Sequence, residues 1–183
     1  MLTAAPGADG RKIPSGPHHV AYVVDDLAAT RHFYEDLIGL PLQATYCETN
    51  EIANSYCHCF FEYGSNGALA FFQFADPAMK AKWKREPLNS LFYHIALRCD
   101  RDVQQGIRDR VAAASYAGQV VEVDHGYCQS LYITDPDGLI IEFTVDAEGV
   151  DHGSRVFKQA HDELQRWLAG DHTPNNVMRA HAS

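Results

Sequence analysis

The chain repeats one pattern of secondary structure, and this repeat limits its possible folds more than any other feature. The pattern is a short apolar strand, a helix and three further strand-like runs, and it occurs at about residues 19–74 and again at about 94–146. The first copy opens with HVAYVV and the second with HIALRC, so a histidine begins the first strand of each. Because an internal repeat fixes the architecture, the sequence predicts an α+β protein built from two βαβββ modules.

Local signals in the first copy support this pattern. Apolar residues between Leu27 and Ile38 recur at helical spacing. Asp26 is placed to cap the start of this helix, and Gly39 is placed to end it. The Asn-Gly pair at 66–67 predicts a tight turn between the last two strands.

The repeat also sets the expected domain boundaries. Residues 1–17 are rich in Gly, Pro and Ala without a hydrophobic period and predict a flexible N-terminal arm. Residues 18–146 form a single predicted domain. Residues 147–183 predict a C-terminal helix and tail, because VFKQAHDELQRWL has a helical period.

Composition excludes several classes of function. The net charge is −9 and there is no basic run, so the chain is not expected to bind nucleic acid. No apolar run approaches the roughly 20 residues of a membrane span, and the N-terminus has no signal-peptide pattern, so we expect a cytoplasmic protein without membrane contact. The cysteines are odd in number and lack a CxxC pair, which favours reduced thiols. They are Cys47, Cys57, Cys59, Cys99 and Cys128.

Three polar residues stand at key places in the repeat. Glu142 lies in the apolar run LIIEFTV, where a buried carboxylate needs a partner or a metal ion. His19 and His94 open the first strand of each module, and two imidazoles with one carboxylate form a facial set that binds a divalent metal and leaves positions open. A lone strand histidine is more often a hydrogen-bonded core or edge residue, but three such residues at matching positions favour a metal site. Neighbouring side chains alternate across a strand, and alignment of the copies selects His19 over His18.

With these residues at these places, the repeat resembles the vicinal oxygen chelate superfamily. That superfamily includes glyoxalases, fosfomycin and bleomycin resistance proteins, and type I extradiol ring-cleavage dioxygenases. The resemblance covers most of residues 18–146. It implies that the two modules form a half-open barrel with the metal on its concave face, and it favours Fe(II) as the metal, with Mn(II) as an alternative.

The segment from Val123 to Glu142, VDHGYCQSLYITDPDGLIIE, is most similar to the extradiol dioxygenases. The resemblance implies that Tyr132 hydrogen-bonds a metal-bound catecholate oxygen and that His125 hydrogen-bonds the substrate hydroxyl. Such fixed donors stabilise charge where it develops. Without the resemblance, the same residues are a loop histidine and a half-buried strand tyrosine.

The first module departs from that family pattern at two places. An ungapped alignment of GALAFF with GLIIEF puts Phe71 at the position of Glu142, where glyoxalase-type isomerases commonly supply a fourth ligand. Phenylalanine cannot coordinate a metal, which favours dioxygenase chemistry. The acid–base histidine of extradiol enzymes is also missing, since Asn66 and Gly67 occupy its region. His58 is the candidate replacement, unless it is a cross-strand residue that faces away.

The sequence therefore predicts an Fe(II)-dependent extradiol dioxygenase of aromatic compound catabolism. Its expected partners are a small aromatic diol and O2, it needs no organic cofactor, and it is expected to form a homodimer because half-open sheets expose edges and apolar surface. One alternative is a glyoxalase- or epimerase-like lyase or isomerase that uses Ni, Mn or Zn. Another is a resistance protein that sequesters a drug without catalysis. The C-terminal helix could serve as a lid or as a dimer contact.

Overall fold

The computed structural model describes residues 16–64, 66–87, 90–149 and 159–176, so most of the predicted N-terminal arm lies outside the described residues. The chain forms two compact units. The first lies within Met1–Asn89, Asp109–Tyr116 and Asp135–Leu139, and the second within Ser90–Arg108, Ala117–Thr134 and Ile140–Ser183. No helix of the described part is both long and apolar enough to span a membrane.

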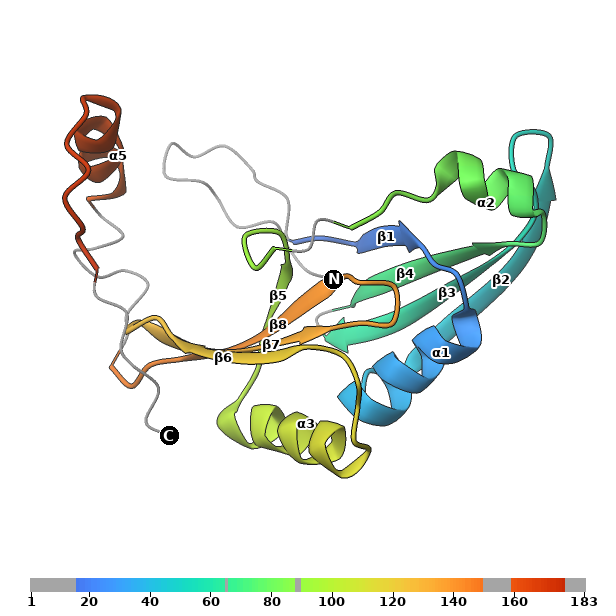
Figure 1. The fold of residues 1–183 in the computed structure, drawn as a ribbon, viewed down its shortest axis with the longest axis horizontal. Coiled ribbons are helices and arrows are strands. Elements are labelled where there is room, and N and C mark those ends of the chain that lie inside the picture. The colour runs from blue at the N-terminus through green and yellow to red at the C-terminus, as the bar shows by residue number, and fades with distance from the viewer. Residues whose placement is uncertain (1–15, 65, 88–89, 150–158, 177–183) are drawn as a thin grey trace. The chain divides into compact units, whose positions relative to one another are not determined.

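The first module is a four-stranded mixed sheet with the order β1-β4-β3-β2 (Figure 1). Strand β1 runs parallel to β4, and the other neighbours are antiparallel. Its elements are β1 (His19–Val23), α1 (Leu27–Arg31), the π-helical segment η1 (His32–Ile38), β2 (Leu42–Asn50), β3 (Asn54–Gly64) and β4 (Gly67–Phe74).

The second module repeats this arrangement with the order β5-β8-β7-β6, again with only the first pair parallel. The predicted α+β fold of two βαβββ modules is therefore confirmed, and each sheet is open rather than closed on itself. The elements are β5 (Ile95–Arg98), α3 (Arg101–Ala113), β6 (Val120–Asp124), β7 (Cys128–Thr134) and β8 (Ile140–Asp146).

Two helices of the described residues lie outside the repeat. The polar connector between the modules contains α2 (Pro77–Trp83), which the sequence did not predict. Asp76 caps it, since its Oδ1 accepts a hydrogen bond from the backbone of Ala78 at 2.8 Å. The helix predicted in the C-terminal segment is present as α5 (Ala160–Leu168).

One face of the first sheet carries the core of its unit. Tyr34 of η1 lies against Phe71 of β4, with 4.6 Å between ring centroids, and both side chains are fully buried. The predicted ends of the helix are confirmed. The Asp26 carboxylate accepts from the backbone of Ala28 at 2.8 Å, and Gly39 ends the helical segment at a φ of 91°.

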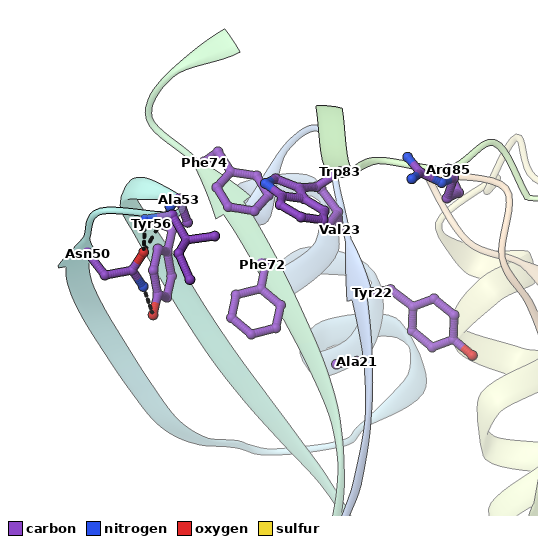
Figure 2. Close-up of a pocket in the computed structure, with 11 residues that line it drawn as sticks. Ala21, Tyr22, Val23, Asn50, Ala53, Tyr56, Phe72, Phe74, Trp83 and Arg85 are labelled. Carbon is purple, nitrogen blue, oxygen red and sulfur yellow. Dashed lines mark hydrogen bonds between the residues drawn. The ribbon is translucent and has the colours of Figure 1, made fainter. Parts of the chain in front are cut away.

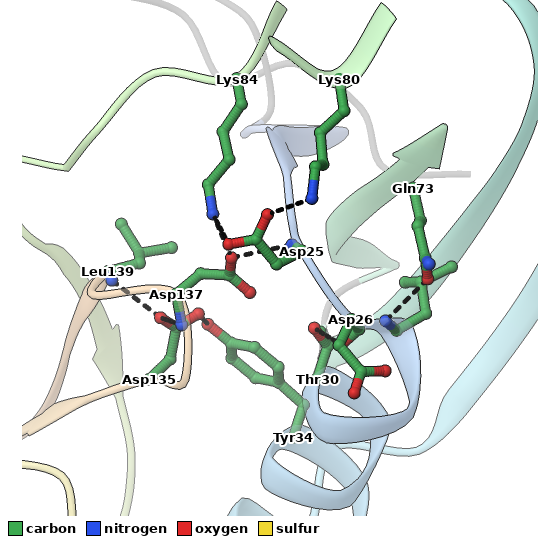
Figure 3. Close-up of polar contacts among 11 residues, drawn as sticks. Asp25, Asp26, Thr30, Tyr34, Gln73, Lys80, Lys84, Asp135, Asp137 and Leu139 are labelled. Atoms are coloured by element: carbon green, nitrogen blue, oxygen red, sulfur yellow. Dashed lines mark hydrogen bonds and ion pairs between the residues drawn. The ribbon is translucent and has the colours of Figure 1, made fainter. Parts of the chain in front are cut away.

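A buried polar cluster holds the Asp-Pro-Asp-Gly turn within the first unit (Figure 3). The Tyr34 hydroxyl donates to Asp135 Oδ2 at 2.9 Å, while Asp135 Oδ1 accepts from the backbone of Asp137 and Leu139 at 2.9 and 2.8 Å. Burial raises the pKa of Asp135 to about 6 in spite of these donors. Gly138 closes the turn at a φ of 88°, where a Cβ would also collide with Pro87.

Candidate metal centre

The second module brings His94 and Glu142 together. Glu142 lies opposite Ala96 in the β5–β8 pairing, and His94 precedes Ala96 by two residues, so both side chains share one face of the sheet. His94 Nε2 lies 2.7 Å from Glu142 Oε2, and the Glu142 side chain is only 7% exposed. His94 Nδ1 lies 2.6 Å from the carbonyl oxygen of Leu91. Because a carbonyl oxygen only accepts, Nδ1 carries the proton and Nε2 is directed to the carboxylate.

Tyr132 and His125 extend this pair. Tyr132 lies directly opposite Glu142 in the β7–β8 pairing and is hydrogen-bonded to it. His125 Nε2 lies 3.0 Å from the Tyr132 hydroxyl. The phenol has one proton, which it donates to Glu142, so His125 donates to the phenol oxygen. We call the connected residues His94, Glu142, Tyr132 and His125 the second-module cluster.

Electrostatics and a tail contact further define the cluster. Burial, followed by the charge of Glu142 and the hydrogen bond to it, raises the pKa of Tyr132 well above its ordinary value. The phenol is therefore protonated at neutral pH. His125 is held through its backbone, whose N–H donates to Cys128 and whose carbonyl accepts from the Asn176 side chain, both at 2.9 Å.

His19 lies on β1 of the first module. Its ring centroid is 5.6 Å from Phe60 and 6.3 Å from His58, so these three side chains share one face of the first sheet. His19 Nδ1 contacts Nδ1 of the exposed His18 at 2.8 Å. In the part of the chain that the structure describes, His19 Nε2 has no hydrogen-bond partner and is available as a ligand.

His58 faces the same side of the sheet as His19 rather than away from it. Its ring stacks on Phe72 at 3.6 Å between centroids. Its Nε2 is buried without a hydrogen-bond partner among the described residues. Burial, followed by the charge of His19, lowers the pKa of His58. A buried polar atom without a partner needs an explanation, and a bound water or ligand supplies one.

The structure corrects the predicted counterpart of Glu142. Glu142 pairs with Ala96 of β5, which is two residues after His94. In the first module, the residue two after His19 is Ala21, and it pairs with Ala70. Phe71 was therefore the wrong position, one residue out of register, and its side chain lies on the core face. The inference that no fourth ligand comes from this position still holds, because alanine has no donor atom.

The predicted ligand set is divided between the two units, with His94 and Glu142 in the second and His19 in the first. Among the residues that the structure describes, no group of three or more His, Cys, Asp and Glu side chains is assembled within either unit. Two of the three predicted ligands therefore converge within one unit, and the assembly of all three remains a prediction.

The first unit also contains an apolar pocket of about 500 Å³ (Figure 2). Phe72 and Phe74 of β4 line it. Trp83 and Arg85 also line it, and they come from α2 and the segment after it. Nothing in the strand pattern indicates these two residues, since they lie in the connector between the modules.

The chain belongs to the Glyoxalase/Bleomycin resistance protein/Dioxygenase superfamily, whose family model matches residues 16–143. No curated protein matches the chain significantly.

Solved structures show the same fold. The genomically encoded fosfomycin resistance protein FosX from Listeria monocytogenes is 17% identical with a TM-score of 0.53, over 74% of this chain and 97% of that one. A glyoxylase/bleomycin resistance protein/dioxygenase domain from Frankia sp. EAN1pec is 16% identical with a TM-score of 0.53, over 76% and 97%. At these identities the likeness concerns the fold alone.

Proposed function

We propose that the protein is a non-haem Fe(II)-dependent extradiol-type dioxygenase that opens the ring of a catechol-like substrate with O2. The observation that carries this proposal is the second-module cluster. It joins two predicted metal ligands, His94 and Glu142, to a phenol and a second imidazole through contacts of 2.7 and 3.0 Å and the hydrogen bond between Tyr132 and Glu142. The superfamily includes dioxygenases, and the geometry supplies the donors that such a reaction needs.

In the proposal His19, His94 and Glu142 hold a divalent metal ion, and each has an atom whose chemistry suits coordination. These atoms are Nε2 of His19, Nε2 of His94 and the buried carboxylate of Glu142. The other ring nitrogen of His94 is hydrogen-bonded to a backbone carbonyl. When bound, Fe(II) supplies the Lewis-acid and redox chemistry of ring opening. Mn(II) is the alternative metal, and FosX from Listeria monocytogenes has been solved with Mn(II).

The remaining polar residues act on the substrate and its protons. With Glu142 engaged as a metal ligand, the Tyr132 hydroxyl would donate its proton to a catecholate oxygen instead of to Glu142, and His125 would contact the second hydroxyl of the substrate. His58 faces the side of the first sheet that carries His19, and its unpartnered Nε2 is the group we assign to proton transfer.

The first module separates this proposal from the isomerase alternative. A glyoxalase-like isomerase requires a fourth ligand or a carboxylate base near the metal. Ala70 occupies the position that corresponds to Glu142, and it supplies neither. Fewer protein ligands leave more coordination positions for a bidentate substrate and O2.

The test is oxygen uptake by anaerobically purified, Fe(II)-loaded protein offered a panel of catechols, with absorbance recorded for a ring-opened product. We expect uptake that is lost in the His94→Ala and Glu142→Gln variants, together with loss of bound iron measured by elemental analysis. The matched controls are His32→Ala, an exposed histidine paired with Asp36, and Glu122→Gln, a strand glutamate that pairs with Arg108 on the face of the second sheet opposite to Glu142. Both controls should retain iron and activity.

Two results would overturn the proposal. Absence of uptake across the panel with iron demonstrably bound would exclude catechol cleavage and favour the isomerase. Retention of iron by Glu142→Gln, with circular dichroism showing a folded protein, would exclude the proposed ligand set.

A further inference from the structure

The apolar pocket of the first unit has aromatic walls, and one of the described residues that line it is charged. Tyr56, Phe72, Phe74 and Trp83 line it, and we call it the aromatic pocket (Figure 2). Tyr56 meets Phe72 edge to face at 5.6 Å, an arrangement that leaves flat ring surfaces for a planar ligand. Its volume of about 500 Å³ lies within the range of small-molecule sites, roughly 300–1,000 Å³.

The aromatic pocket adjoins the face of the sheet that carries His19. Ala21 and Val23 line the pocket, two and four residues after His19 on the same strand, and alternate residues of a strand share a face. Phe72 also links the two regions, because it lines the pocket while its ring stacks on His58. A ring bound near His19 can therefore extend a substituent into the pocket.

Most polar groups that line the pocket already have partners in the protein. The Asn50 amide nitrogen donates to the Tyr56 hydroxyl at 3.3 Å, and Asn50 Oδ1 accepts from the backbone of Ile52 and Ala53. These groups hold the β2–β3 turn. They leave little hydrogen-bonding capacity for a ligand.

Arg85 is different. It is the one charged side chain among the described residues that line the pocket, and its guanidinium donates through Nη1 to the carbonyl oxygens of Lys82 and Lys84 at 2.9 and 3.0 Å. No carboxylate pairs with it among the described residues. The neighbouring Lys84 is paired with Asp25 and Asp137 (Figure 3). In a chain with a net charge of −9, an arginine without a carboxylate partner beside aromatic walls is suited to an anionic ligand.

We propose that the aromatic pocket binds the substituent of a carboxylate-bearing aromatic substrate, with Arg85 as the counter-ion of the carboxylate. The inference rests on the proposed function in that this ligand is the ring-cleavage substrate. It adds the substrate class, a catechol whose apolar substituent ends in a carboxylate, and it assigns Arg85, Phe72 and Trp83 to substrate selection.

The test measures binding to the full-length protein after removal of metal with EDTA, by isothermal titration calorimetry. The probes are 3-phenylpropionate and its neutral counterpart 3-phenylpropan-1-ol, which differ mainly in the charged group. We expect the carboxylate to bind at least about tenfold more tightly, the ratio that corresponds to one charge-assisted hydrogen bond. Arg85→Gln should remove this preference and leave the affinity for the alcohol unchanged.

Two further variants locate the site. Phe72→Ala should weaken binding of both probes, because it removes a wall of the pocket. Arg31→Gln is the matched control, since this exposed arginine of α1 pairs with Glu35 and Asp36 and does not line the pocket. Quenching of Trp83 fluorescence in a Trp167→Phe background reports binding at the pocket itself.

Equal affinity for the two probes, a carboxylate preference that survives Arg85→Gln, or no binding of either probe would overturn the inference. Its failure is distinguishable from failure of the proposed function, because the binding test requires neither metal nor O2. Oxygen uptake with catechols but no carboxylate preference would reject Arg85 as the counter-ion and leave the dioxygenase intact. A preference that depends on Arg85, without uptake by the iron-loaded protein, would reject the dioxygenase and leave an aromatic carboxylate site.

Discussion

The two modules have the same strand order but present different chemistry on corresponding strands. In the second module the residues opposite each other on the last two strands are Tyr132 and Glu142. The corresponding pair in the first module is Phe60 and Ala70. Both pairs occupy the same place in the pairing pattern, so the difference lies in the side chains and not in the backbone.

This difference divides the proposed work between the modules. The second module carries a connected chain of ionisable groups, and the first carries a mainly apolar, aromatic surface that also includes His19 and His58. A hydrogen-bonded network fixes donors for a charged reaction, while aromatic walls bind a ring without competing for its polar groups. In the proposal, the second copy supplies two of the three metal ligands and the groups that contact the substrate hydroxyls, and the first copy supplies His19 and an apolar, aromatic wall.

The largest expected effect tests the correspondence between the modules, in which Ala70 and not Phe71 is the counterpart of Glu142. Phe71 is fully buried against Tyr34 and Phe61, so Phe71→Ala should lower the free energy of unfolding by about 3–5 kcal/mol. The metal affinity of the folded variant should be unchanged, because Phe71 faces the core. Chemical denaturation and a metal titration check the two parts.

The neighbouring residue is the matched control for this prediction. Phe72 lies on the opposite face, so Phe72→Ala should weaken ligand binding and cost less stability than Phe71→Ala. If Phe71→Ala altered metal affinity and Phe72→Ala lowered stability more, the assignment of Ala70 as the counterpart of Glu142 would be wrong.

Moving a hydroxyl from Tyr132 to the corresponding residue Phe60 tests whether the two modules have different roles. Tyr132→Phe removes one fixed donor from the second-module cluster and should lower kcat by about 10²–10³-fold, with a much smaller change in KM. Phe60→Tyr, which places a hydroxyl at the corresponding position of the first module, should not restore activity in that background. Steady-state kinetics on both variants give the answer. Recovery of kcat in the double variant would show that the two positions are interchangeable and would remove the division between the modules.

The smallest of these effects concerns the turns before the last strands. The first module has Asn66–Gly67, while the turn before β8 contains the buried Asp135. The pKa of Asp135 is about 6 in the folded protein against 3.8 for the free side chain, so the folded state binds more protons between these pH values. Stability from this group is therefore present below pH 3.8 and is lost as the pH rises through about 6, by at most about 3 kcal/mol.

Asp135→Asn removes this titration. The free energy of unfolding of the variant, relative to the unchanged protein, should rise between about pH 4 and pH 7, as measured by urea denaturation at each pH. Asp36→Asn is the control of opposite sign, because the Arg31 guanidinium lowers the pKa of the exposed Asp36. A pH-independent difference for Asp135→Asn would show that this carboxyl titrates normally in the folded protein.

Several features were determined by the sequence alone. Patterns along the chain predicted the repeat, the Asp26 cap, the Gly39 stop and the position of Glu142 on the last strand. His94, which was expected to open a strand, directly precedes β5. The family resemblance selected His125 and Tyr132 as site residues, and their direct contact at 3.0 Å came from the structure.

The tertiary structure decided the rest. The segments GALAFF and GLIIEF are almost continuously apolar, so no alternation marks their register, and a slip of one residue moved the expected counterpart of Glu142 from Ala70 to Phe71. The face of the sheet that His58 occupies depended on the pairing of β3 with β4. Trp83 and Arg85 reach the pocket only because the connector folds into α2 beside the sheet, and contacts between distant segments leave no periodic signal in the sequence.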